Sequence, residues 1–309
     1  MHSLLKSGVI VLTALISACG SGTAEIGSGN NSGGQGRLSL KITDAPIDNA
    51  NKVVIEFVGV ELRSSSLDEI INIDFAPKSI DLLALQGIST AVLLDNEPLP
   101  AGVYNELRLK INADDDGELE SFIELSDGSQ HELIIPSGFT SGLKIKGELS
   151  LSEDSTGNFT VDFDVRRSIV VAGGQGNSKV KYHLKPVLRL TEDTSTGNIR
   201  GLVHADLLTD STCSDSDPVT DNAVYVFAGS VIPDDMDSSS DTDIEPLTSV
   251  LLDDTFNYTA AFLPAGEYTL AFTCRADIEN VDTDDDLSFL AINNVLVVAG
   301  ETRVVNLDP

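Results

Sequence analysis

Apolar and polar residues alternate along most of this chain, and this period of two constrains the fold more than any other feature of the sequence. Leu38, Leu40 and Ile42 alternate with polar neighbours, and the pattern continues at 54–62. Alternation puts every second side chain of an extended strand on the same face, so that one face can be buried. No stretch after residue 18 shows a helical period. The pattern therefore predicts an all-β protein.

Turn residues divide the alternating stretches into many short strands, which is typical of antiparallel β-sandwiches. Further strands are expected at 70–75, 79–85, 105–111, 122–125, 131–135, 143–151, 158–165 and 182–190, and then at 199–206, 223–228, 249–252, 256–262, 266–274, 288–298 and 302–307. A polar break at 192–197 separates the two groups. We predict two antiparallel β-sandwich domains in tandem, 37–196 and 197–309.

The first 18 residues have the layout of a bacterial lipoprotein signal peptide. Lys6 supplies a positive charge, 9–15 form an apolar stretch, and the small residues Ser17 and Ala18 stand directly before Cys19, as in a lipobox. The apolar run is shorter than the ~20 residues of a membrane-spanning helix. We expect the signal to be removed and Cys19 to become the lipidated first residue, carrying acyl chains such as palmitate.

Residues 19–36 continue from this cysteine with a composition of mostly Gly, Ser and Asn, which is typical of a flexible tether. Gly20 follows Cys19, where an aspartate would favour retention in the inner membrane. The expected location is the outer membrane or the cell surface, with the N-terminal lipid as the one membrane contact.

The chain is strongly acidic, with a formal net charge of −30 at pH 7. Residues 198–309 contain no lysine, three arginines and 22 acidic residues, and this asymmetry supports a separate second domain. A surface of this charge repels nucleic acids and anionic lipid headgroups. Nucleic acid is therefore excluded as a partner, whereas cations, basic proteins and neutral polymers such as polysaccharides are compatible. A surface that only keeps the protein soluble is the alternative.

Two cysteines, Cys213 and Cys274, remain if Cys19 carries lipid. An even number of cysteines in an oxidising compartment predicts a disulfide between them. Two buried free thiols are the alternative.

A short repeat links the two predicted domains. The sequence LPAGVY occupies 99–104 and LPAGEY occupies 263–268. Pro and Gly favour a turn, and the tyrosine that opens the next strand can pack its ring in the core while its hydroxyl bonds to the backbone, as in a tyrosine corner. The repeat therefore predicts two related sandwiches.

No set of residues typical of an enzyme stands out. The histidines that follow the signal peptide, His131, His183 and His204, have neither metal-ligand spacing nor a neighbouring nucleophile motif. Acidic residues are so numerous that a carboxylate pair suited to glycoside hydrolysis would arise by chance. We therefore predict that the protein is not an enzyme.

Calcium is the one cofactor that the sequence suggests, because carboxylate and amide oxygens recur at alternating positions. Asn112, Asp114 and Asp116 precede Gly117 in this way, but Ile123 stands where an EF-hand loop needs its glutamate. The other acidic sets are Asp282, Asp284 and Asp286, and a longer loop with Asp234, Asp235, Asp237, Asp241 and Asp243. A solvated acidic loop without an ion is the alternative at each place.

Several motifs resemble a bacterial lipoprotein family that carries a domain of unknown function. They cover about 37–190 and comprise LSLKITDAP at 38–46, VVIEFVGVEL at 53–62, LPAGVY at 99–104, IPSGFTSGLK at 135–144, DFDVR at 162–166 and LKPVLR at 184–189. Residues 197–309 are similar to sandwiches of the prealbumin-like, carboxypeptidase-regulatory type, on GNIRGLV at 197–203, AVYVFAG at 223–229 and LPAGEYTL at 263–270. The first resemblance implies no functional residues, and the second implies an accessory, non-catalytic module.

The sequence leaves two functions open. The first is a non-enzymatic, cell-envelope binding or adhesion module for an extracellular polymer or protein, stabilised by calcium. The second is a structural or assembly lipoprotein that faces the periplasm and has no small ligand. The first is favoured because two sandwiches follow a long tether.

Overall fold

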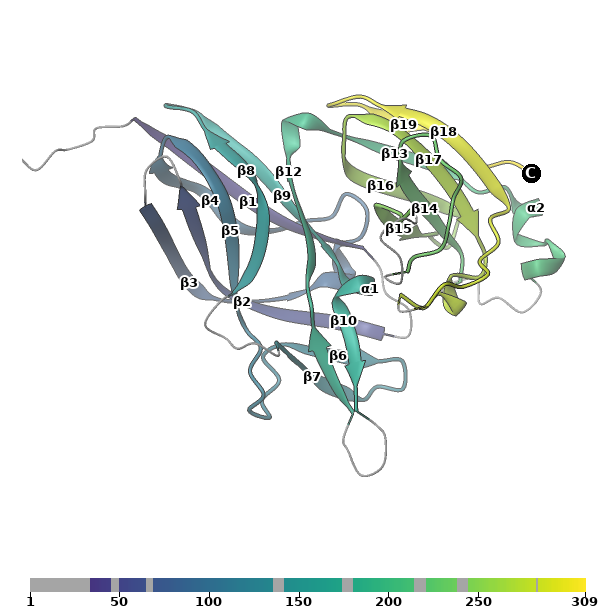
Figure 1. The fold of residues 1–309 in the computed structure, drawn as a ribbon, viewed down its shortest axis with the longest axis horizontal. Coiled ribbons are helices and arrows are strands. Elements are labelled where there is room, and N and C mark those ends of the chain that lie inside the picture. Colours follow the sequence, from purple (N-terminus) through teal and green to yellow (C-terminus); the bar gives the residue numbers. More distant parts are fainter. Residues whose placement is uncertain are drawn as a thin grey trace, which may run out of the picture. The chain divides into compact units, whose positions relative to one another are not determined.

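The computed structural model describes residues 34–45, 50–64, 69–135, 142–173, 180–213, 221–237, 244–281 and 283–309. Strands dominate this part of the chain, and the elements from Gly34 to Pro309 form one compact unit (Figure 1). None of the helices in the described ranges is long and apolar enough to cross a membrane. The predicted signal peptide and Cys19 lie outside the described residues, as does nearly all of the predicted tether.

The first twelve strands form two sheets. They are β1 (Gln35–Ala45), β2 (Ala50–Ser64), β3 (Glu69–Asp81), β4 (Ala91–Pro100), β5 (Gly102–Asn112), β6 (Phe122–Leu125), β7 (Gln130–Ile134), β8 (Leu143–Leu151), β9 (Thr156–Asp164), β10 (Ile169–Ala172), β11 (Lys181–Leu184) and β12 (Val187–Glu192). One sheet has the order β12-β9-β1-β4, and the other has the order β10-β11-β7-β6-β2-β5-β8, with β3 paired to β2. Alternating side chains of both sheets, such as Leu38, Leu40 and Ile42 of β1 and Ile55 and Phe57 of β2, meet in one buried core.

The remaining strands form a second pair of sheets. They are β13 (Thr196–Leu202), β14 (Ala223–Ala228), β15 (Thr248–Leu251), β16 (Asn257–Pro264), β17 (Gly266–Thr273), β18 (Ala291–Val297) and β19 (Thr302–Val304). Their orders are β16-β13-β19 and β15-β14-β17-β18, and a second buried core contains residues of both sheets. The all-β sandwich prediction is confirmed, with one addition: β1–β9, β7–β11 and β13–β19 pair in parallel.

The LPAG repeat forms the same connection between sheets in both halves of the chain. It carries the chain from β4 to β5 and from β16 to β17, in each case from one sheet to the other. The Tyr104 hydroxyl donates to the Pro100 carbonyl at 2.7 Å, and the Tyr268 hydroxyl donates to the Pro264 carbonyl at the same distance. The residue between Pro and Gly also donates its N–H in both halves, to the carbonyl that precedes the first strand of that half. The predicted turn and buried tyrosine are thus present twice.

Some strand predictions were wrong, and each error has a local cause. Residues 82–85 form a 3-10 turn, η1 (Leu82–Leu85), since the run LLAL lacks the β-branched residues that favour a strand. The expected strand 182–190 is split into β11 and β12 at Pro186, because proline has no N–H to donate. Strand β4 was missed because the polar pair Asp95 and Asn96 interrupts its alternation, and Asn96 has φ 50°.

The first strand also begins earlier than predicted. Gln35 and Gly36 were assigned to the tether from their composition, yet they pair with Pro100 and Leu99 of β4. Backbone hydrogen bonds extend the strand here, and they do not depend on side-chain hydrophobicity. The tether prediction is corrected at these two residues. The boundary between the predicted domains at 196 and 197 stays a prediction.

Candidate functional site

Strand β14 is buried on both faces, and this determines where the acidic loops lie. Val224 and Val226 face the core between the sheets, whereas Tyr225 and Phe227 face the opposite side. Phe289 packs edge-on against both rings, with centroid distances of 5.5 Å to Tyr225 and 6.1 Å to Phe227. Segment 229–237 and the described residues of segment 276–289 cover this outer face. Apolar packing thus brings together two acidic stretches that are far apart in the sequence.

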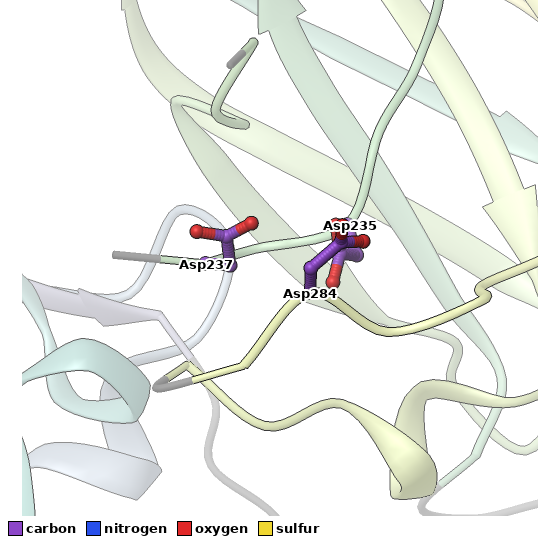
Figure 2. A group of neighbouring side chains, drawn as sticks. All are labelled: Asp235, Asp237 and Asp284. Carbon is purple, nitrogen blue, oxygen red and sulfur yellow. The ribbon is translucent and has the colours of Figure 1, made fainter. Parts of the chain in front are cut away.

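The two segments place a group of carboxylates side by side. Asp235 and Asp237 come from one segment and Asp284 from the other (Figure 2), and one carboxylate oxygen of each lies within 4.8 Å of the others. Asp235 also belongs to a second group of this kind, with Glu279 and Asp285. Asp235 is 4% exposed and Asp237 is 7% exposed. We call these five residues the acidic cluster.

Backbone N–H groups hold the acidic cluster in place. The N–H of Asp285 donates to Oδ2 of Asp235 at 2.5 Å, and the N–H of Met236 donates to Oε1 of Glu279 at 3.1 Å. The N–H of Asn280 donates to Oδ2 of Asp285 at 2.7 Å. These bonds tie the two segments to each other, so the carboxylates are positioned by the backbone.

Burial and repulsion between neighbouring carboxylates both raise the pKa of Asp235 and of Glu279. Loss of solvent raises the pKa of Asp235, and the charges of Asp234, Asp237 and Asp284 raise it further. Burial raises the pKa of Glu279 to about 7, although hydrogen bonds from Tyr225 and Met236 oppose the change. A bound cation would relieve both the repulsion and the loss of hydration, and carboxylate oxygens are the ligands that calcium prefers.

One buried cation already lies near the acidic cluster. Arg166 belongs to the short helix α1 (Val165–Ser168), which follows β9, and is 6% exposed. Its Nη1 donates to the Tyr225 hydroxyl at 3.1 Å and to the Ala276 carbonyl at 3.4 Å. The Tyr225 hydroxyl in turn donates to Oε2 of Glu279 at 2.7 Å. The arginine of the DFDVR motif is therefore linked to Glu279 of the acidic cluster by a chain of two hydrogen bonds through the Tyr225 hydroxyl.

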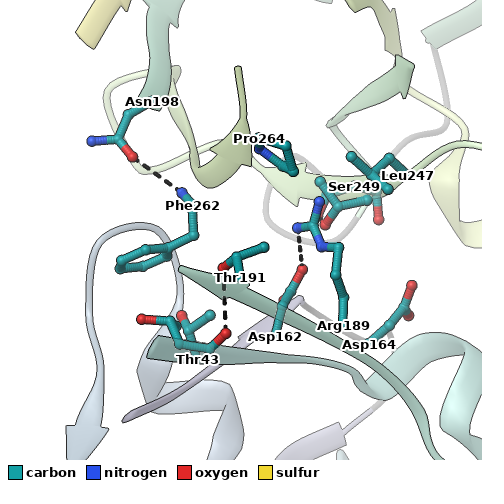
Figure 3. A network of polar contacts seen from close by, with 12 residues as sticks. Thr43, Asp162, Asp164, Arg189, Thr191, Asn198, Leu247, Ser249, Phe262 and Pro264 are labelled. Carbon is teal, nitrogen blue, oxygen red and sulfur yellow. Dashed lines mark hydrogen bonds and ion pairs between the residues drawn. The ribbon is translucent and has the colours of Figure 1, made fainter. Parts of the chain in front are cut away.

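Other polar contacts join the two pairs of sheets. Arg167 donates from Nη2 to the Leu247 carbonyl at 3.4 Å, and Nζ of Lys41 lies 5.9 Å from the centre of the Phe262 ring. Figure 3 shows Arg189 of β12 next to Leu247, Ser249 and Pro264 of the second sandwich, and its Nη2 donates to Oδ2 of Asp162 on the neighbouring strand β9 at 2.5 Å, within the first sandwich. The junction is thus held by cationic side chains of the first sandwich, which suits the acidic second sandwich.

The structure separates the predicted calcium residues. Asp284 joins the acidic cluster, Asp286 is exposed outside it, and Asp282 lies outside the described residues. Sequence analysis did not single out Glu279 or Asp285 as ligands. Asp285 is part of the run DDD at 284–286, whereas Glu279 has no local signal, because its role depends on the fold around β14.

The other predicted loop is arranged differently. Nδ2 of Asn112 donates to Oε1 of Glu56 at 2.6 Å, and Asp114 and Asp116 are exposed. The N–H groups of Asp116 and Gly117 both donate to Oε1 of Glu132 at 3.0 Å. Among the described residues, this loop contributes no group of three acidic ligand atoms within 4.8 Å. Calcium binding at Asn112, Asp114 and Asp116 stays a prediction.

The predicted disulfide is present. Cys213 ends the turn η3 (Ser211–Cys213), Cys274 directly follows β17, and their Cα atoms are 5.5 Å apart across a sequence separation of 61 residues. Both cysteines are buried in the core of the second sandwich. Lipidation of Cys19 lies outside the described residues and stays a prediction.

A serine and a histidine meet in the β6–β7 hairpin. The Ser129 hydroxyl lies 3.1 Å from Nε2 of His131, whose ring packs against Tyr182 at 4.8 Å. Asp127, two residues before the serine, accepts the Ser129 N–H at 2.8 Å. Within the described residues these contacts shape a hairpin turn, and no hydrogen bond joins Asp127 to the imidazole, as a catalytic triad would need.

Comparison with known families finds a match in the first half of the chain. Residues 35–186 match the model of the family described as Domain of unknown function (DUF4382). The expected resemblance to a domain of unknown function is therefore confirmed over β1 to β11. The lipoprotein nature of the chain and the prealbumin-like resemblance of 197–309 stay predictions. No curated protein matches this sequence.

Solved structures give only weak likenesses. A candidate carbohydrate-binding protein from Pseudomonas aeruginosa is 13% identical, with 38% of this chain and 90% of that chain covered and a TM-score of 0.21. The minor pilin GBS52 from Streptococcus agalactiae is 13% identical, covers 87% and 94%, and has a TM-score of 0.20. The major pilin subunit BcpA from Bacillus cereus is 10% identical, covers 89% and 100%, and has a TM-score of 0.19. These scores are too low to support an inference about function.

Proposed function

We propose that this protein is a non-enzymatic lipoprotein of the cell envelope that binds an extracellular polymer or protein, and that calcium at the acidic cluster stabilises its second sandwich. The lipid at Cys19 would hold the protein in the outer membrane, and the tether would carry the sandwiches away from it. The observation that carries the calcium part is the convergence of Asp235, Asp237 and Asp284, since two of these carboxylates are buried.

Thermal unfolding of residues 34–309 tests calcium binding directly. We expect millimolar calcium to raise the unfolding midpoint by several degrees relative to chelator, because a ligand at a hundred times its Kd adds about 2.7 kcal/mol of stability. Magnesium should give a smaller shift, because it demands a tighter octahedral ligand set. Coincident curves in calcium and chelator would refute the calcium part.

A matched pair of variants assigns the effect to the acidic cluster. Asp235→Asn removes one carboxylate from both groups and should reduce the calcium-dependent shift by more than half. Asp308→Asn removes the same charge from an exposed position near the C-terminus and should keep the full shift. An equal loss in both variants would mean that calcium acts through net charge alone.

The lipoprotein and binding parts are tested on cells. Cys19→Ser should abolish incorporation of labelled palmitate and release the protein from the membrane fraction. Protease added to intact cells should digest the protein if it faces outward, whereas protection until lysis would favour the periplasm-facing structural alternative. Equal binding of glycans and proteins by wild-type and deletion strains would overturn the binding role.

A further inference from the structure

A groove of about 460 Å³ opens where the two sandwiches meet, away from the acidic cluster. One wall comes from the first sandwich and includes Gln86, Gly87 and Ile88, which follow η1. The other wall comes from the second sandwich and includes Arg200 of β13 and Asn257 of β16. The volume lies in the range of small-ligand sites. We call this feature the junction groove.

Two side chains on opposite walls of the junction groove are available to a ligand. Arg200 and Gln86 are both exposed, and neither side chain forms a hydrogen bond or an ion pair within the described residues. This is unusual for Arg200, because it is one of three cations in an acidic half of the chain. A guanidinium and an amide present planar donor groups, and the amide also accepts.

Three other polar side chains of the junction groove, Asn198, Asp253 and Asn257, are held by hydrogen bonds within the protein. Nδ2 of Asn257 donates to Oδ1 of Asp253 at 3.3 Å, and Thr255 donates to the same oxygen from its N–H and its hydroxyl. Oδ1 of Asn198 accepts the N–H of Phe262 at 3.1 Å (Figure 3). Side chains fixed before binding lose little entropy when a ligand arrives.

The charge of the junction groove selects among ligand classes. It is lined by one guanidinium and by two carboxylates, Asp44 and Asp253, in a protein of net charge −30. Polyanions are repelled by this surface. The donors of Arg200, together with the donor and acceptor groups of Gln86, fit a neutral ligand that carries hydroxyl groups. Ile88, whose side chain is 68% exposed, adds an apolar contact for the C–H face of a sugar ring.

Edge strands of both sheets of the second sandwich line the junction groove: β15 (Thr248–Leu251), β16 (Asn257–Pro264) and β19 (Thr302–Val304). Addition of a peptide strand to one of these edges is therefore the competing mode of binding. The test below includes peptides for this reason.

We propose that the junction groove binds a neutral oligosaccharide, with Arg200 and Gln86 contacting its hydroxyl groups from opposite walls. This inference rests on the proposed binding function, for which it names the ligand class and the site. Because the walls come from both sandwiches, the site exists only while the junction is intact.

The test is binding of the full chain to peptides and to a glycan array that carries neutral, sialylated and sulfated oligosaccharides. We expect binding to neutral glycans, and a loss of about tenfold or more in affinity for Arg200→Ala and for Gln86→Ala, since one hydrogen bond to a charged or amide group is worth about 1.4 kcal/mol. Arg303→Ala is the matched control: Arg303 lies on the neighbouring strand β19 outside the groove lining, and this variant should bind like the wild type.

The outcomes separate this inference from the proposed function. Binding of a neutral glycan that is unchanged in Arg200→Ala and Gln86→Ala would overturn the junction groove and leave the binding function standing. Binding of peptides or proteins without binding of any neutral glycan would overturn the proposed ligand class and leave the binding function standing. Binding of no glycan, peptide or protein would overturn both proposals.

Discussion

Glu279 offers a direct test of the electrostatics of the acidic cluster. Its side chain is partly buried, accepts hydrogen bonds from Tyr225 and Met236, and has its pKa raised to about 7 by burial. We predict that Glu279→Gln stabilises the calcium-free protein at pH 8 and does not stabilise it at pH 5. The substitution removes the charge and keeps the size of the side chain.

The magnitude follows from proton linkage. The unfolded chain ionises Glu279 near its ordinary pKa of 4.5, whereas the folded state keeps the proton up to about 7. The raised pKa means that folding is favoured most below pH 4.5 and that this contribution is lost as the pH rises through 7. At 1.36 kcal/mol per pKa unit, about 2 to 3 kcal/mol of stability disappears between pH 5 and pH 8. Gln retains only one accepting oxygen, which costs about 1 kcal/mol, so the net gain at pH 8 is about 1 to 2 kcal/mol.

Urea unfolding at pH 5 and pH 8 in chelator measures this difference. The wild type should lose stability between the two values, and Glu279→Gln should lose less. Glu267→Gln, at an exposed position on β17, removes the same charge and should follow the wild type. Equal pH dependence of the wild type and Glu279→Gln would refute the reasoning, because the buried carboxylate would then ionise as it does in water.

Three further predictions concern the framework that holds the sites. Replacement of Cys213 and Cys274 by Ala should cost about 4 kcal/mol, from the loop entropy of a 61-residue separation, seen as a lower urea midpoint. Tyr104→Phe and Tyr268→Phe should each cost about 1 kcal/mol in the free energy of unfolding, because each leaves a proline carbonyl without its donor. Arg166→Met should cost about 3 kcal/mol and raise the pKa of the nearby glutamate further, which a steeper pH dependence would reveal.

Each of these predictions has an internal control. Reduced wild-type protein should unfold like the double cysteine variant, and a difference would mean that the substitutions themselves disturb the core. Tyr182→Phe removes a hydroxyl that makes no hydrogen bond within the described residues, so it should cost less than the two corner variants. Arg63→Met removes an arginine on the surface that is paired with Glu61 and Glu106, and it should cost clearly less stability than Arg166→Met. A similar loss of stability in Arg63→Met and Arg166→Met would contradict the expectation that the buried arginine contributes more than the surface one.

Local periodicity was sufficient for most strands but not for their ends. Alternation located β6 and β8 at their observed bounds, because a strand with one buried face repeats every two residues. It missed β4 and the start of β1, where backbone pairing with a neighbour extends the strand through polar residues. It also could not show that Tyr225 and Phe227 are covered from outside β14, because burial on a second face depends on segments distant in sequence.

The sequence by itself determined that this protein is all-β, that Cys213 and Cys274 can pair, and that the LPAG turn occurs in both halves, because each of these follows from spacing or composition. Only the tertiary structure decided which acidic residues converge. Asp235 and Asp284 meet because two distant segments cover one face of β14, and Arg200 and Gln86 line the same groove because two sandwiches pack together. Contacts of this kind depend on long-range packing, and no local pattern of residues encodes them.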